Sequence, residues 1–235
     1  MKRAVLFLCL AVFILLVIQP NLSGSTRTPE MRVPKNTDEP VSNMDIAQRQ
    51  SESGMTIAID PSVSSTASAG GEAESDVAMD MTAALGRALK KAGYNVVYTR
   101  WYTQPDASLT QNDAQEAAVI SAKENQASLL ISLQYNSGTP AQRGFSIFTK
   151  PNDPRLDLLA ERLSSELTRS SYSISQGIDT DHYANFPVLA DEGMPAVMLQ
   201  LGSLVDEQEY EILTRPEFQE QLAGAIASAI LETMD

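Results

Sequence analysis

Polar side chains able to bind a ligand or carry protons stand at the ends of short apolar runs or beside them. These side chains are Asp60, Glu74, Ser132, Gln134, Asn136 and Gln200. The three in the stretch LLISLQYN alternate, so they share one face if that stretch is a strand. Carboxylates can bind metals or exchange protons, whereas carboxamides only donate and accept hydrogen bonds. Because ligands bind beyond the carboxyl ends of strands in α/β sheets, we expect a polar site there.

The histidine and cysteine content limits metal chemistry, since the chain has one of each. No site can therefore use two histidines, and Cys9 has no partner for an internal disulfide. His182 lies in the polar stretch GIDTDHYANF, which predicts a solvated surface loop. The alternative is a metal site with Asp179 and Asp181, whose spacing matches no calcium-binding loop. No G-x-S-x-G motif appears, so a Ser-His-Asp triad is not supported.

The elements that must position these groups alternate along the chain. Apolar and β-branched runs predict strands over 56–60, 95–99, 129–135, 145–148, 186–189 and 196–201. Helical periodicity and caps predict helices over 75–91 and 113–126, one opening at Asp153-Pro154, and two opening at Asp206 and Thr214. This order predicts an α/β fold with three layers, in which a mostly parallel, twisted sheet has helices on both faces.

The first 54 residues differ in composition from the rest. Lys2 and Arg3 precede an apolar run over residues 4–18, which is short for a membrane span. Residues 1–25 therefore predict a signal peptide or, as the alternative, a signal anchor that tethers the chain to a membrane. Residues 26–54 contain three prolines and no apolar period, and we expect a flexible linker. Residues 55–235 then form an extracytoplasmic domain, secreted or membrane-anchored at the cell envelope.

The charge of the chain excludes one class of partner. Lys and Arg number 17 against 30 Asp and Glu, which gives a net charge of −13. Such an acidic protein repels phosphate backbones, so we expect no nucleic-acid binding. The same repulsion opposes docking on anionic lipid surfaces.

Six stretches resemble, in order, the motifs of the zinc-dependent N-acetylmuramoyl-L-alanine amidases of the Amidase_3 type. They are TIAIDPSVSS (56–65), ESDVAM (74–79), GRALKKAGYNVVYTR (86–100), SLQYN (132–136), RGF (143–145) and PAVMLQLGSLVD (195–206). The resemblance covers about residues 55–233. It implies the α/β fold of these bacterial cell-wall hydrolases for residues 55–235 and peptidoglycan as the material they act on.

The resemblance also implies positions for the site residues. In the family, two His and one Glu bind zinc, and a second Glu acts as the base. The zinc positions are here Val63, Glu74 and Gln134, and the catalytic Glu position is Gln200. Valine has no lone pair, and a Gln carbonyl is a weak donor for zinc. Because Gln200 cannot take a proton either, we predict no catalytic residue, no metal and no cofactor.

Two further positions allow more than one interpretation. Asp60 matches a structural Asp of the family, and we expect its side chain to cap the loop that follows the strand. Trp101 and Tyr102 follow a predicted strand, where such aromatics either stack on sugar rings or pack under a loop.

The dismantled site favours binding over catalysis. Glu74, Gln134, Asn136 and Gln200 form a vestigial pocket that either binds peptide amides and sugar hydroxyls or is sealed by its own hydrogen bonds. The leading hypothesis is an exported, inactive amidase-like domain that binds peptidoglycan or a cell-envelope protein. One alternative is an active amidase with a rearranged site. Another is a regulator or scaffold of an active paralogue.

Overall fold

The computed structural model describes residues 54–101, 109–136, 142–170 and 174–234. These residues belong to the second of two units, Val41–Asp235. The predicted leader (1–25), all but the last residue of the predicted linker, and Tyr102 lie outside the described residues. Within the described part, none of the helices has the length and apolar character needed to cross a membrane.

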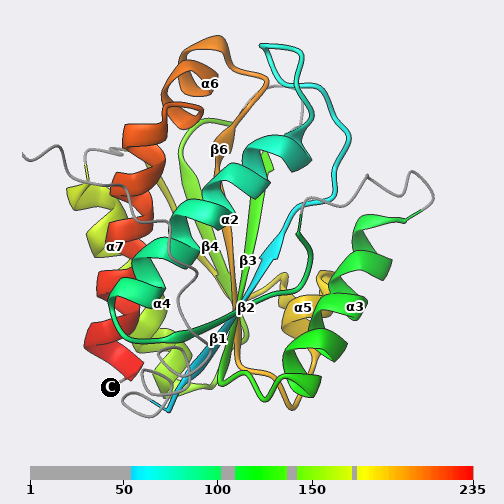
Figure 1. Cartoon of the computed structure of the whole chain (residues 1–235), viewed down its shortest axis with the longest axis vertical. Helices are drawn as coiled ribbons and strands as arrows, with labels where there is room; N and C mark the ends of the chain where they lie inside the picture. The colour runs from blue at the N-terminus through cyan, green and yellow to red at the C-terminus, as the bar shows by residue number, and fades with distance from the viewer. Residues whose placement is uncertain (1–53, 102–108, 137–141, 171–173, 235) are drawn as a thin grey trace, which may run out of the picture. The chain divides into compact units, whose positions relative to one another are not determined.

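A six-stranded sheet forms the middle layer, in the order β2-β1-β3-β6-β4-β5 (Figure 1). The strands are β1 (Thr56–Pro61), β2 (Asn95–Tyr98), β3 (Leu129–Asn136), β4 (Phe145–Thr149), β5 (Ser175–Asp179) and β6 (Ala196–Ser203). β2, β1, β3 and β6 pair in parallel, β4 is antiparallel to β6, and β5 is parallel to β4. The prediction of a mostly parallel sheet is therefore confirmed.

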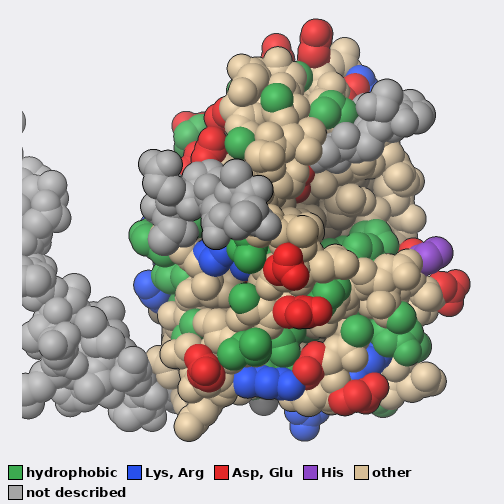
Figure 2. All heavy atoms as spheres, turned by 90° about the vertical axis from the view of Figure 1, so that its right-hand side faces the viewer, with side chains coloured by type: hydrophobic (Ala, Val, Ile, Leu, Met, Phe, Trp, Pro, Cys, Tyr) green, Lys and Arg blue, Asp and Glu red, His purple; other side chains and the backbone are tan. Residues whose placement is uncertain are grey.

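Helices cover both faces of the sheet, which confirms the three layers (Figure 1). One face carries α2 (Glu74–Lys91), α4 (Pro154–Arg169) and α7 (Pro216–Met234). The other face carries α3 (Gln111–Glu124) and α5 (Pro187–Ala190), which follows the short 3-10 helix η1 (Tyr183–Asn185). The helix α6 (Glu207–Leu213) connects β6 to α7. Figure 2 looks onto the side with α3 and α5, where Asp and Glu side chains are spread over the surface.

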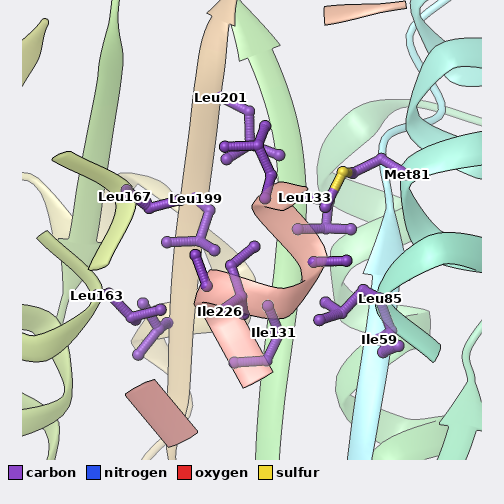
Figure 3. Packing of buried hydrophobic residues seen from close by; sticks show 14 of the residues in the cluster. Ile59, Met81, Leu85, Ile131, Leu133, Leu163, Leu167, Leu199, Leu201 and Ile226 are labelled. Carbon is purple, nitrogen blue, oxygen red and sulfur yellow. The ribbon is translucent and has the colours of Figure 1, made fainter. Parts of the chain in front are cut away.

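Alternation along the central strands assigns each side chain to one core. On β3, Ile131 packs with α2, α4 and α7, whereas Leu130 packs on the side of α3 and α5. Figure 3 shows Leu163 of α4, Leu199 of β6 and Ile226 of α7 in the larger core. A strand buried on both faces needs apolar residues in succession, which explains the unbroken apolar start of β3.

Several local predictions differ from the structure, and two of the differences concern strands. The prediction of a strand over 186–189 is wrong, because residues 187–190 form the one-turn helix α5. Pro187 occupies its first turn, where the fixed φ of proline suits a helix and its missing N–H costs no hydrogen bond. The strand β5 was not expected, because Ile178 is its one large apolar residue. Backbone pairing with β4 stabilises β5 as an edge strand.

The predicted N-cap at Asp206 is confirmed, but the prediction that a helix opens at Thr214 is wrong, because Thr214 is the C-cap of α6 and α7 begins at Pro216. The carboxylate of Glu209, in the first turn of α6, bonds groups outside its own helix. Asp206 Oδ1 accepts hydrogen bonds from the backbone N–H groups of Gln208 at 3.1 Å and of Glu209 at 3.0 Å. The buried Glu209 carboxylate accepts from Gly144 N at 2.8 Å and from Ser203 N at 2.7 Å. It therefore joins the start of β4 to the end of β6, beside the expected site.

We expect Glu209→Ala to lower the free energy of unfolding by about 2–4 kcal/mol, because two buried N–H groups lose a charged acceptor. Urea unfolding followed by circular dichroism measures the change. Glu211→Ala, on the exposed side of α6, is the matched control and should change this free energy by less than about 0.5 kcal/mol. Equal losses in the two variants would contradict the role of Glu209.

Candidate functional site

Asp60 lies at the carboxyl end of β1 with no exposed surface. Its Oδ1 forms an ion pair with Arg100 and accepts a hydrogen bond from Thr99 Oγ1 at 3.0 Å. Its Oδ2 accepts from Ser132 Oγ at 2.9 Å. Because Thr99 and Arg100 follow β2 and Ser132 belongs to β3, one carboxylate joins the ends of three neighbouring strands.

The prediction that Asp60 caps the following loop is wrong. Ser62 Oγ makes that contact, accepting from Ser64 N at 3.1 Å, while Arg100 and the two hydroxyl groups hold the Asp60 carboxylate at the sheet. Burial raises the pKa of the Asp60 carboxyl, and the Arg100 charge and the hydrogen bonds offset part of that rise. Asp60 is therefore a structural carboxylate.

Gln134 continues this network along β3. Its Nε2 donates to Ser132 Oγ at 3.0 Å, so these two side chains share a face, as predicted. Its Oε1 accepts from Gln111 Nε2 at 2.9 Å, and Gln111 Oε1 accepts from Val63 N at 3.3 Å. Gln111 thus bridges Val63 and Gln134, the two positions that the resemblance assigns to zinc-binding histidines.

Sequence reasoning missed Gln111, because the helix was expected to begin at residue 113. The structure begins α3 at Gln111, with Thr110 as its N-cap. Thr110 Oγ1 accepts from Asp113 N at 3.2 Å, and Asp113 Oδ2 accepts from Thr110 N at 3.3 Å. This T-x-x-D capping box is the sequence signal that places Gln111 at the helix start.

The side chain of Glu74, the first residue of α2, contacts the backbone at the same end of β3. The side chain is 4% exposed, and Oε1 accepts from Tyr135 N at 3.1 Å. The Tyr135 ring lies in the core beside α2, and burial together with the carboxylates of Glu74 and Asp80 raises the pKa of its hydroxyl. Glu74 therefore connects α2 to the end of β3.

Gln200 lies beside Gln134 in the parallel register of β3 and β6, and opposite Ser146 of β4. Its half-buried side chain lines a pocket of about 390 Å³. Asn136 follows a register shift, and its Nδ2 donates to Gln142 O at 3.3 Å. Of the four predicted pocket residues, the structure thus places Gln134 and Gln200 side by side, while Glu74 and Asn136 make backbone contacts nearby.

The donor atoms at the assigned zinc positions do not fit a zinc ion. Val63 offers no side-chain donor, and the Gln134 amide uses its oxygen and nitrogen to bind Gln111 and Ser132. Glu74 alone offers a carboxylate, whereas a hydrolytic zinc site needs three protein ligands and an open position. Over the described ranges, no three His, Cys, Asp or Glu side chains are grouped to hold a metal ion.

His182 lies in an exposed loop, as predicted. Its imidazole is 64% exposed, and Nδ1 lies 2.7 Å from Asp179 Oδ2. Asp179 Oδ1 accepts from the backbone N–H groups of Asp181 at 2.9 Å and of His182 at 3.0 Å. Burial acts to raise the pKa of Asp179, but these hydrogen bonds hold it below its usual value.

Trp101, at the edge of the sheet, is 45% exposed and stacks at a tilt on Tyr98.

Comparison with known proteins identifies the family. The family described as N-acetylmuramoyl-L-alanine amidase (Amidase_3) matches residues 51–232. The chain belongs to this family. The resemblance stated from the motifs is confirmed, and the chain is a peptidoglycan-related, amidase-like protein whose relatives indicate a cell-envelope location.

Two curated relatives are similar in sequence. The uncharacterised protein YqiI of Bacillus subtilis is 28% identical over 159 residues, which cover 67% of this chain and 72% of YqiI. An uncharacterised cell wall amidase of Bacillus anthracis is 26% identical over 152 residues, which cover 61% of this chain and 28% of that protein.

Solved structures confirm the fold. The catalytic domain of the amidase CwlV from Bacillus (Paenibacillus) polymyxa has a TM-score of 0.64 at 23% identity. The match covers 77% of this chain and 98% of the CwlV chain. The amidase CwlD of Clostridioides difficile, solved in complex with the GerS lipoprotein, has a TM-score of 0.61 at 21% identity, with the same coverage. At these identities the likeness concerns the fold alone.

We expect Asp60→Ala to lower the free energy of unfolding by about 3–5 kcal/mol, because it leaves the largely buried Arg100 charge uncompensated. Urea unfolding measures the loss. The double variant Asp60→Leu/Arg100→Met removes both charges and should recover part of it. A double variant as unstable as Asp60→Ala would show that the unpaired charge is not the cause.

Proposed function

We propose that this protein is an exported, catalytically inactive amidase-like domain that acts by binding peptidoglycan or a cell-envelope protein. The observation that carries the proposal is the Gln111 bridge between Val63 N and the Gln134 amide. Where the family pattern calls for two imidazoles, this chain has a valine and a glutamine, and Gln111 bonds the backbone of the first and the amide of the second. Residues 4–18, as a cleaved signal or as a tether, account for the proposed export.

The residue chemistry supports binding rather than hydrolysis. Amide hydrolysis of this kind needs a metal that lowers the pKa of a bound water and a base that takes its proton. The donor set of Val63, Glu74 and Gln134 supports neither metal binding nor water activation. The Gln200 amide, at the position of the family base, offers hydrogen bonds and no proton acceptor of useful basicity.

One neighbour favours a protein partner as the second candidate. The CwlD amidase, which shares the fold, was solved in complex with the GerS lipoprotein. A domain of this fold without catalysis is suited to hold or regulate another envelope protein, including an active paralogue. A pull-down that recovers an amidase or a lipoprotein, from a chain that does not bind the wall, would favour this candidate.

Zinc loading tests the inactive site directly. After loading and desalting, we expect the full chain to retain almost no zinc and the triple variant Val63→His/Gln134→His/Gln200→Glu to retain about one ion per chain. The variant restores two imidazoles beside Glu74, and elemental mass spectrometry measures the ratio. Adding Glu74→Ala to the triple variant is the matched control and should lower zinc retention. About one zinc ion per chain in the natural protein would contradict the inactive site and favour the active-amidase alternative.

Wall binding tests the positive half of the proposal. The purified full chain should cosediment with insoluble peptidoglycan while liberating no stem peptides, because the site binds without hydrolysis. Peptide release that a chelator abolishes would contradict the inactive site. Absence of both release and cosedimentation would contradict the peptidoglycan candidate and leave the protein partner.

A further inference from the structure

The pocket beside Gln200 lies on a part of the sheet that the helices leave open. It has a volume of about 390 Å³ and is lined by residues of β4, β5 and β6, by the loop after β5 and by Gln142, which precedes β4. The helix α4 packs on β4 and β5 from the opposite face. Ligand pockets have volumes of about 300–1,000 Å³, so the space suits a small ligand.

Two hydrogen-bonding side chains in the pocket have no partner among the residues that the structure describes. Ser146 and Gln200 are directly opposite each other in the antiparallel register of β4 and β6. Ser146 is 8% exposed, and neither side chain makes a hydrogen bond within the described part of the chain. Because buried polar groups need partners, a hydroxyl and a carboxamide placed in this way are suited to the N–H and C=O groups of a peptide.

The charge of the pocket selects among peptides. Asp179 and Asp181 line one wall, and no Lys or Arg is among the lining residues. The Asp179 carboxylate already bonds Asp181 and His182 of its own loop. The Asp181 carboxylate has no hydrogen bond or ion pair within the described ranges and is exposed. Such a wall attracts an ammonium group and repels phosphate or carboxylate.

We propose that this pocket binds a peptide through its free ammonium group, with Asp181 facing the ammonium and with Gln200 and Ser146 bonding the adjacent amide. The inference rests on the proposed wall-binding function. Hydrolysis of the amide by an active amidase breaks its C–N bond, leaving a carboxyl group on the glycan and an amino group on the peptide. That amine is mostly protonated at neutral pH. The released peptide therefore carries this group at the cleaved bond, and we expect it to bind this pocket more tightly than the same peptide does when it is amide-linked in the wall.

Calorimetric titration of the full chain tests this assignment. The probes are peptides released from peptidoglycan by an active amidase, either native or N-acetylated. We expect the native peptides to bind and acetylation to weaken binding, because it removes the charge. Asp181→Asn should weaken binding of the native peptides by about two- to fivefold, the effect of one partly solvated charge pair, and leave acetylated peptides unaffected. Gln200→Ala should weaken both.

Asp157→Asn, an exposed site on α4 at the other face of the sheet, is the matched control and should bind as the natural chain does. Equal affinity for native and acetylated peptides, or no effect of Asp181→Asn, would overturn the assignment. If released peptides do not bind while intact peptidoglycan cosediments, this inference fails and the proposed function stands. Failure of both experiments would overturn the inference together with the peptidoglycan candidate.

Discussion

The buried carboxylate of Asp60 is the contact on which the polar end of the sheet depends. It accepts hydrogen bonds from Thr99 and Ser132 and pairs with Arg100, so three strand ends share one charged group. Ser132 Oγ in turn accepts a hydrogen bond from Gln134 Nε2. A charge buried without these partners would be costly, so the positions of β1, β2 and β3 at this end are coupled.

The residues that stabilise the fold are distinct from the residues that form the site. The large core between the sheet and α2, α4 and α7 contains none of the carboxamides of the site. Packing therefore preserves the family fold whichever polar residues stand at the strand ends. On the opposite face, Gln111 and Gln134 close one half of the site by bonding each other. In the other half, the side chains of Gln200 and Ser146 have no hydrogen-bond partner in the described part of the chain and lie beside an open pocket.

Long-range contacts decide which half is closed. Gln111 and Gln134 are 23 residues apart in the chain, and Gln111 and Val63 are 48 apart. The motif positions predicted that Gln134 and Gln200 meet, because neighbouring parallel strands end at one edge. No pattern in the sequence indicated that Gln111, in the helix α3, would bridge Gln134 and Val63. Nor did any pattern reveal β5, whose stability as an edge strand comes from its pairing with β4.

The sequence by itself determined the layers of the fold, most of its strands and helices, and the family, because apolar periodicity, caps and motif order are local properties of the chain. It also determined which residue types stand at the site positions. The tertiary structure alone decided the partners: Asp60 clamps strands instead of capping a loop, and Gln111 occupies the hydrogen bonds of Gln134. The physical reason is that a polar side chain bonds whichever group the folded chain brings within about 3 Å, and sequence spacing does not give that distance.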